Sequence, residues 1–325
     1  MSRPKLLVTS RWPEAVEAAL SERFDTTFSR GDRALNRNEL GAALTSSDAL
    51  LPSSGDRIDA ALLSDYRPRA KLVANCAIGE GLIDVAAARA KGITVTNTPD
   101  SLSACTADLT LMLMVKVARQ AACAAEKAAG IAPSNDWGRR DLTGVTIAGK
   151  TLGLVGFGRI GQAVAQRAHW GFGMTVLAYD RVQHDPSLLA TCGAKLCGSL
   201  DELVGAADFL SLHCPVGPET HHLVDARRLD LMKPGAFLIN TARGDMVDGQ
   251  ALLHALWFDT IAGAALDTYD GDAGLLEQLK ACPTAVLTPH LKRGQPETRE
   301  AQGMRVVQNI EDFFAGRQPR DAVTT

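Results

Sequence analysis

The chain has 325 residues, more than one hydrophobic core usually serves, so we expect two domains. Its 34 basic and 37 acidic residues give a net charge of −3, which excludes the basic surface typical of nucleic-acid and anionic-membrane binders. No apolar run reaches the roughly 18 residues of a membrane span, and the first residues lack the apolar core of a signal peptide. The sequence therefore predicts a soluble, cytoplasmic protein whose partners are small molecules.

The seven cysteines argue against a disulfide framework. Their number is odd, and no two of them form a C-x-x-C pair. We expect reduced and mostly buried thiols, and no bound metal.

Apolar strand patterns alternate with amphipathic helix patterns through residue 100. The expected strands are 5–9, 26–28, 49–51, 71–74 and 93–96, and the expected helices are 14–23, 37–43, 58–63 and 84–91. Such alternation predicts a parallel sheet with helices on both faces. No nucleotide fingerprint occurs here, so we expect this domain to bind something other than a dinucleotide. A long helical pattern at 101–130 follows and is expected to link the two domains.

Residues 149–180 carry a complete pattern for holding a dinucleotide. An apolar run at 151–155 is followed at once by GFGRIG, a G-x-G-x-x-G turn that opens a helix. Gly156 allows the tight turn, Gly158 lets the backbone approach a pyrophosphate, and Gly161 lets helix and strand pack closely. The free N–H groups at the start of that helix favour an anion.

The second strand of this pattern, at 175–178, leads to an acid that bears on cofactor choice. Asp180 can accept hydrogen bonds from both ribose hydroxyls of NAD and repels a 2′-phosphate. Arg181 beside it can accommodate that phosphate. NAD is therefore the expected cofactor, and NADP stays the alternative.

Beyond Asp180 the alternation resumes to the end of the chain. The expected strands are 208–212, 236–239, 262–266 and 285–287, and the expected helices are 201–206, a short one ending near 232, 249–256 and 297–314. With 151–155 and 175–178 these make the six strands of a Rossmann domain. We predict an α/β protein with two Rossmann-like, doubly wound parallel-sheet domains and a cleft between them. Residues 1–100 plus 289–325 would form a discontinuous substrate-binding domain, and 101–288 the NAD-binding domain.

Polar side chains at the ends of the expected strands suggest the chemistry of that cleft. Reducing a 2-keto acid requires a cation that holds the carboxylate and polarises the carbonyl, and a proton donor for the developing alkoxide. Arg243 offers a planar fork that matches a carboxylate, and His290 changes charge near neutral pH. A carboxylate from Asp270 or Asp272 would orient the imidazole and favour its charged form.

Several stretches spread over nearly the whole chain share one pattern. They are ADLTLMLMVKVAR, GKTLGLVGFGRIGQAVAQRA, DFLSLHCPVGPETHHLV, LMKPGAFLINTARGDMVD, IAGAALD and VLTPH. These motifs resemble those of the D-isomer-specific 2-hydroxyacid dehydrogenase family, and most closely those of its glyoxylate and hydroxypyruvate reductase branch. The resemblance implies hydride transfer between NAD(H) and a small 2-keto or 2-hydroxy acid, in a homodimer joined through the NAD-binding domain.

The resemblance also implies roles for individual residues. Arg243 would bind the substrate carboxylate and carbonyl, His290 would be the acid/base, and Asp272 would be its carboxylate partner. The backbone N–H groups of the loop with Ala77, Ile78 and Gly79 would bind the substrate carboxylate. The implied cofactor contacts, with the fingerprint glycines and their neighbours, are Thr106, Gly156, Gly158, Arg159, Ile160, Gly161, Asp180, Arg181, Cys214, Pro215, Ala242 and Asp267.

Three departures from the family pattern fall in the predicted cleft. Asp272 stands in place of a glutamate, so it keeps the charge but shortens the reach by one methylene. Lys292 and Arg293 replace a Gly-Ser pair after the histidine and add two cations near the substrate. The substrate loop at 76–82 also differs from the usual pattern. These changes indicate either altered substrate choice or weakened catalysis, and neutral sequence drift is the alternative.

Two alternatives therefore stay open beside the reductase. One is a catalytically weakened NAD(H)-binding sensor or regulatory protein on the same scaffold. The other is a dehydrogenase for a different, more anionic 2-hydroxy acid, with Lys292 or Arg293 as an added anchor.

Overall fold

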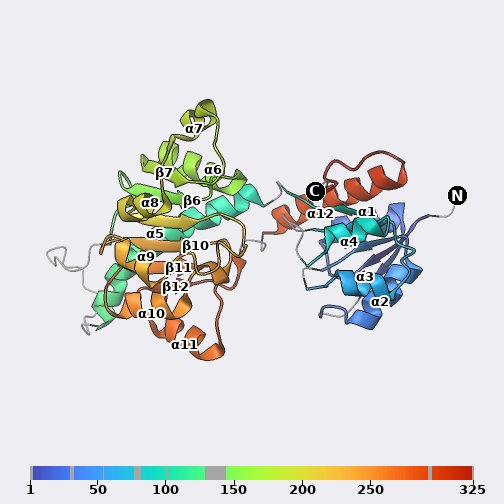
Figure 1. The fold of residues 1–325 in the computed structure, drawn as a ribbon, viewed down its shortest axis with the longest axis horizontal. Helices are drawn as coiled ribbons and strands as arrows, with labels where there is room; N and C mark the ends of the chain where they lie inside the picture. The colour runs from blue at the N-terminus through green and yellow to red at the C-terminus, as the bar shows by residue number, and fades with distance from the viewer. Residues whose placement is uncertain are drawn as a thin grey trace. The chain divides into compact units, whose positions relative to one another are not determined.

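The computed structural model describes residues 3–29, 33–53, 55–76, 82–99, 102–128, 144–291 and 295–323. The chain divides into two compact units: the first is Met1–Leu102 with Arg293–Thr325, and the second is Ser103–Lys292. Each contains a parallel sheet covered by helices, so the predicted α/β fold class is confirmed (Figure 1). The sequence placed the division after residues 100 and 288, and the ligand that each unit binds stays a prediction.

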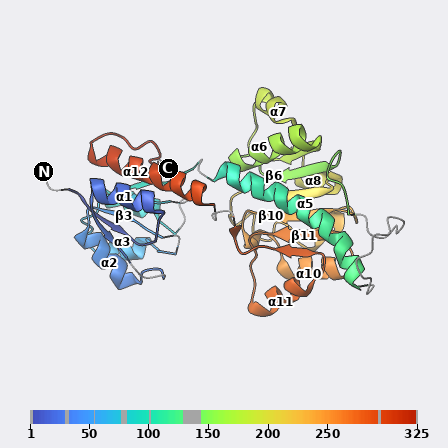
Figure 2. The same ribbon diagram turned by 180° about the vertical axis from the view of Figure 1, so that it is seen from behind.

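The first unit has a five-stranded sheet in the order β2-β1-β3-β4-β5. Its elements are β1 Lys5–Val8, α1 Glu14–Arg23, β2 Asp25–Phe28, α2 Arg37–Ser46, β3 Ala49–Leu51, α3 Ala60–Asp65, β4 Leu72–Ala74, α4 Val85–Ala90, β5 Thr94–Thr96 and α12 Pro296–Phe314. Strands β3 and β4 are buried along their whole length, because both faces of the sheet are covered. Helices α1 and α12 lie side by side on one face, and α2, α3 and α4 cover the other (Figure 2).

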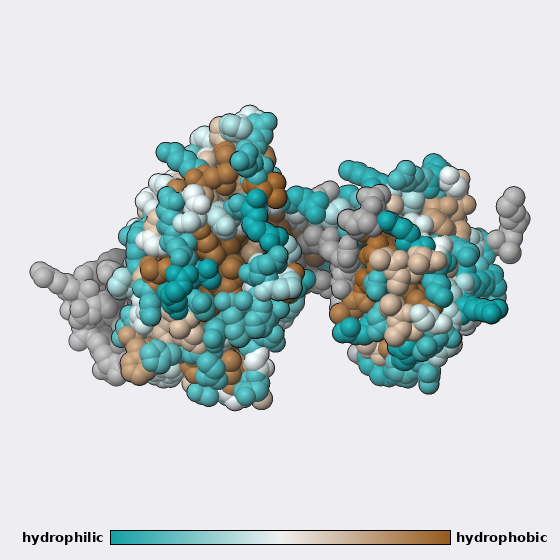
Figure 3. Space-filling view, in the orientation of Figure 1, coloured by the Kyte–Doolittle hydropathy of each residue, from teal (hydrophilic) through white to brown (hydrophobic). Residues whose placement is uncertain are grey.

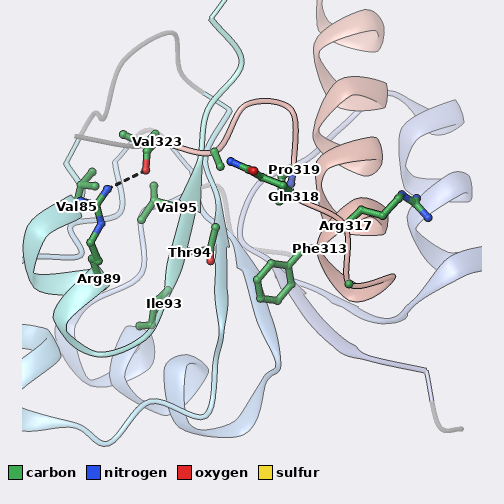
Figure 4. A pocket seen from close by; sticks show the side chains of 12 residues that line it. Val85, Arg89, Ile93, Thr94, Val95, Phe313, Arg317, Gln318, Pro319 and Val323 are labelled. Carbon is green, nitrogen blue, oxygen red and sulfur yellow. Dashed lines mark hydrogen bonds between the residues drawn. The ribbon is translucent and has the colours of Figure 1, made fainter.

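A further segment extends the sheet of the first unit beyond β5. Residues 321–323 pair with this strand in the antiparallel direction. Asp321 is buried and accepts hydrogen bonds of 2.6 and 2.7 Å from the guanidinium of Arg305. Beside the segment lies a surface pocket of about 490 Å³, where Arg89 donates to the carbonyl of Val323 at 3.2 Å (Figure 4). The edge of β5 is therefore covered by the chain itself.

The second unit has a seven-stranded parallel sheet in the order β12-β11-β10-β9-β6-β7-β8. Its strands are β6 Thr151–Val155, β7 Thr175–Tyr179, β8 Ala194–Leu196, β9 Phe209–Leu212, β10 Phe237–Asn240, β11 Gly263–Leu266 and β12 Ala285–Leu287. The sequence predicted six of these strands and missed β8, a three-residue edge strand in which only Ala194 is buried. The strand order reverses between β6 and β9, and open α/β sheets bind ligands at such a switch point.

Helices cover both faces of the second sheet. They are α5 Ser103–Ala128, α6 Arg159–Gln166, α7 Pro186–Cys192, α8 Leu200–Ala206, α9 Ala226–Leu231, α10 Gly249–Trp257 and α11 Ala273–Ala281. Helices α5, α6 and α7 pack on one face, which α5 crosses in Figure 2, and α8 to α11 pack on the other. The sequence analysis missed α7 and α11, which begin at the capping side chains of Asp185 and Asp272.

The face drawn in Figure 3 mixes hydrophilic residues with smaller hydrophobic areas on both units. In the second unit the exposed large apolar side chains include those of Trp170, Trp257 and Phe258. Among the described helices, none combines the length and the apolar character that crossing a bilayer requires.

Candidate functional site

The turn between β6 and α6 is shaped by two glycines that admit no side chain. Gly156 has a φ of +95°, and a Cβ on it would lie 2.8 Å from the backbone nitrogen of Cys214. A Cβ on Gly161 would overlap the carbonyl oxygen of Gly156. Gly158 differs, because a Cβ there would meet nothing within 4 Å. Gly156 and Gly161 let the backbone pack closely, and Gly158 leaves open space in front of the helix.

That open space lies in front of the first turn of α6, which no side chain caps. Gly158 is the N-cap residue of α6 and has no side chain to satisfy the first N–H groups of the helix. Unsatisfied N–H groups and the helix dipole attract an anion. The turn thus fits the pyrophosphate of a dinucleotide.

Asp180 follows β7 and is oriented by backbone donors. Its Oδ2 accepts from the N–H of Phe157 at 2.7 Å, and its Oδ1 accepts from the N–H of Val182 at 3.1 Å. Nε2 of His184 lies 3.2 Å from Oδ2. Burial raises the pKa of Asp180, but these three groups outweigh it and hold the pKa below its usual value. The carboxylate is therefore ionised, with acceptor positions left on both oxygens.

Arg181, which could bind the 2′-phosphate of NADP, forms an ion pair with Glu219 in this structure. Its Nη1 lies 2.9 Å from Oε1 of Glu219. Both side chains are more than 60% exposed, so this ion pair is weak and separates at little cost.

Two further predicted cofactor residues present distinctive chemistry. Burial raises the pKa of the Cys214 thiol to about 11, so the group is neutral beside the first glycine. Thr106 on α5 is buried, and its hydroxyl finds no hydrogen-bond partner among the described residues. A buried hydroxyl of this kind fits a site that a polar ligand completes.

The remaining predicted cofactor residues lie around the same strand ends. Arg159 and Ile160 open α6, Pro215 follows β9, and Ala242 follows β10.

Asp267, at the end of β11, forms hydrogen bonds with the segment that contains His290. It is 1% exposed, and its Oδ1 accepts from the hydroxyl of Thr288 at 2.7 Å and from the N–H of Leu291 at 2.6 Å. His290 lies between these two donors and has a φ of +59°, which a residue other than glycine seldom adopts. The two hydrogen bonds hold this conformation in place.

Asn240, which the sequence analysis did not single out, shapes the loop of Arg243. It is fully buried at the end of β10, donates to the carbonyl of Arg243 at 2.7 Å and accepts from the N–H of Ala242 at 3.0 Å. An asparagine directly after an apolar strand is a signal for such a side-chain-closed turn. This loop packs tightly, because a Cβ on Gly244 would overlap the backbone nitrogen of Asp270.

Within the second unit, one pocket brings the predicted catalytic residues together. Arg243, Asp270 and His290 all line it, and its volume is about 700 Å³. Two of its lining residues, Asp245 and Thr268, carry buried oxygens without a hydrogen-bond partner among the described residues. The pocket therefore combines a cation, an imidazole and unsatisfied polar atoms.

Asp272, the other candidate partner of the histidine, has a different task in this structure. Its Oδ1 accepts from the N–H of Leu275 at 2.8 Å and so caps α11. It is absent from the pocket lining that includes Asp270. Its assignment as a catalytic residue stays a prediction.

Five of the predicted substrate-site residues lie outside the described residues, and their assignment also stays a prediction. They are Ala77, Ile78, Gly79, Lys292 and Arg293.

The second unit matches a known family model. The model describes the D-isomer specific 2-hydroxyacid dehydrogenase, NAD binding domain, and it matches residues 111–291. Over its full length the chain is 37% identical to the glyoxylate reductase of Thermococcus onnurineus (strain NA1), covering 98% of this chain and 95% of that one. The chain belongs to the D-isomer-specific 2-hydroxyacid dehydrogenase family. The family and the oxidoreductase class predicted from the sequence are thereby confirmed.

Solved structures place the dehydrogenase among the same relatives. A glyoxylate reductase from Paecilomyes thermophila has a TM-score of 0.83 and 29% identity, covering 99% of this chain and 98% of that one. An acyclic imino acid reductase (Bsp5), solved in complex with NADPH and D-Arg, has a TM-score of 0.84 and 26% identity, covering 98% and 100%. The enzyme is a dehydrogenase of small keto and hydroxy acids that uses a nicotinamide cofactor.

Proposed function

We propose that the enzyme reduces glyoxylate, hydroxypyruvate and related short 2-keto acids with NADH. The observation that carries this proposal is the pocket in which Arg243 and His290 meet. The name of the Thermococcus relative, glyoxylate reductase, supports this substrate class.

In this proposal the side chains of the pocket divide the chemistry between them. The guanidinium of Arg243 binds the substrate carboxylate and polarises the neighbouring carbonyl. A nicotinamide bound at the glycine-rich turn would supply a hydride for the carbonyl carbon. His290 gives its proton to the oxygen, so the product is the neutral hydroxyl and the imidazole is left uncharged.

We further propose that Asp270 is the carboxylate that favours the charged form of His290. It lines the same pocket, whereas the side chain of Asp272 caps α11. Asp272, which stands at the position of the family's glutamate, is the alternative. The backbone of Ala77, Ile78 and Gly79, with Lys292 as an added anchor, completes the proposed substrate site.

We propose NAD as the preferred form of the cofactor. Asp180 is ionised and repels a 2′-phosphate, and Arg181 is paired with Glu219. NADP is the second candidate, because that ion pair is exposed and the structure of the imino acid reductase holds NADPH.

We propose a cytoplasmic homodimer joined through the second unit. The six described cysteines are free thiols, which fits a reducing compartment. Exposed apolar side chains on the second unit, including Met112 and Val115 of α5, supply the kind of surface that dimers bury. Light scattering on the purified protein tests this, and a monomer at micromolar concentration would contradict it.

Oxidation of NADH and of NADPH, followed optically with a panel of short 2-keto acids, tests the proposed activity. We expect turnover with glyoxylate or hydroxypyruvate, and a higher kcat/KM with NADH than with NADPH. Tight NADH binding without turnover of any acid would instead support the sensor, which the capping role of Asp272 favours. Turnover only of acids with a second anionic group would support the alternative substrate class.

A further inference from the structure

His184 carries a largely buried imidazole for which the proposed reaction has no task. It lies four residues beyond Asp180, with the two side chains 14% and 19% exposed. Its ring stands edge-on to the fully buried ring of Phe157, with the centroids 5.3 Å apart. The N–H of Phe157 donates to the same carboxylate oxygen that Nε2 of His184 approaches. The imidazole is thus wedged between the glycine-rich turn and the carboxylate.

The imidazole and the carboxylate are in close contact. Nε2 is 3.2 Å from Oδ2 of Asp180, yet it is buried and has no partner in hydrogen-bond geometry among the described residues. Burial keeps Nε2 away from a ligand. Any effect of His184 on the cofactor is therefore exerted through Asp180.

The charge of this imidazole decides how negative the ribose site is. With a neutral His184, the ionised Asp180 opposes the two negative charges of a 2′-phosphate. With a protonated His184, an opposite charge 3.2 Å from the carboxylate cancels much of that repulsion. The ribose hydroxyls of NAD carry no charge and are less affected.

We propose that His184 is a positioning residue that sets the discrimination between NAD and NADP, and that its protonation relaxes this discrimination. The inference rests on the proposed role of Asp180 in binding the ribose. It adds a pH dependence to cofactor choice that neither Asp180 nor Arg181 explains alone.

The other charged groups around Asp180 keep their charge where histidines titrate. The hydrogen bond and the charge of Glu219 raise the pKa of Arg181, so this guanidinium stays protonated. Hydrogen bonds lower the pKa of Asp185, through Ser187, and of Glu219, through its own N–H and Arg181, so both carboxyls stay ionised. The thiol of Cys214 stays neutral. Histidine is the side-chain type that changes charge between about pH 5 and 8.

Fluorescence titration of the full-length protein with NADH and with NADPH tests the proposal without any need for turnover. We measure the ratio of the two Kd values at about pH 5.5 and about pH 8. For the wild type, the preference for NADH should fall about fivefold more between the alkaline and the acidic condition than it does for H184Q. The comparison is needed because the 2′-phosphate itself takes up a proton near pH 6, and that contribution is common to both proteins.

Two further variants fix the interpretation. H184R carries a permanent charge and should show a weaker preference for NADH than the wild type at pH 8, whereas H184Q should match the wild type at pH 8. In both variants the change in preference between the two pH values should be only the part that comes from the 2′-phosphate. H254Q alters an exposed histidine that stacks on Phe258 in α10 and should behave like the wild type. Equal pH dependence in wild type and H184Q, or an unchanged preference in H184R, would overturn the proposal.

These outcomes are separable from the fate of the proposed function. If no keto acid is reduced but the Kd ratio follows this pattern, the role of His184 stands and the reaction is misassigned. If keto acids are reduced but the Kd ratio has the same pH dependence in wild type and H184Q, the reaction stands and the role of His184 fails.

Discussion

At the cofactor end of the second unit, Gly156 and Gly161 let backbone meet backbone, whereas the reaction end relies on the buried side chains of Asn240 and Asp267 to fix its loops. The first arrangement is a close approach of backbone to backbone, between Gly156 and Cys214 and between Gly161 and Gly156. The second joins residues up to 24 positions apart, as between Asp267 and Leu291. Binding and catalysis should therefore respond to different kinds of substitution.

The largest effect is expected at the reaction end, from replacing His290 with Asn. Asparagine tolerates the left-handed φ of +59°, so the loop should keep its shape while the proton donor is lost. Values of kcat should fall by about 10²- to 10⁴-fold, with the Kd for NADH unchanged. Stopped-flow and steady-state measurements of NADH oxidation check this. Near-normal turnover would remove His290 from the proposed chemistry.

At the cofactor end, G158A and G161A form a matched pair. A methyl group on Gly158 meets no protein atom, so the fold should be unaffected, but it enters the space in front of α6 and should weaken NADH binding more than about tenfold. A methyl group on Gly161 overlaps the carbonyl of Gly156 and should lower the free energy of unfolding by about 1–3 kcal/mol. Urea unfolding and NADH titration on both variants separate these effects. The reverse assignment would refute the distinction drawn between the two glycines.

A second matched pair, D270N and D272N, asks which carboxylate serves His290. Asparagine is a good N-cap residue, so D272N should keep α11 capped and leave kcat nearly unchanged. D270N should lower kcat about tenfold and move the alkaline limb of the pH profile to lower pH. A larger loss in D272N would assign the role to the position of the family's glutamate.

The smallest expected effect is on stability at low pH and concerns Asp180. Because its pKa is lowered on folding, it stabilises the protein above its ordinary pKa of 3.8, and this contribution is lost as the pH falls through the lowered value. The difference in free energy of unfolding between wild type and D180N should be about 1 kcal/mol at pH 7 and should vanish in strong acid. Urea titrations between these limits measure it. A difference that grows with acid would contradict the lowered pKa.

The same contrast explains what could be predicted from the sequence. The fingerprint at 156–161 and the strand before it are local patterns, so the α/β fold and the cofactor turn followed from spacing alone. Arg243 and His290 could be identified from the sequence because each follows an apolar strand. The hydrogen bonds of Asp267 could not be foreseen, because they form only when β11 and β12 lie side by side.

Helix α11 shows where local patterns were too weak. It begins with Ala273 and Gly274, and its glycine lowers the helical signal just where the capping aspartate stands. The sequence therefore did not reveal that Asp272 caps this helix. The contact between His184 and Asp180 was invisible for another reason, since it depends on the turn of the chain after β7 and on the ring of Phe157.

Residues 321–323, which run along β5, have a consequence for the behaviour of the protein in concentrated solution. An unpaired edge strand offers its N–H and C=O groups to any other chain, and so seeds strand-by-strand aggregation. Here the segment occupies that position, and the buried ion pair between Asp321 and Arg305 anchors it. Weakening the ion pair between Asp321 and Arg305 would expose β5 to pairing with other chains and leave the cofactor turn and the catalytic pocket unchanged.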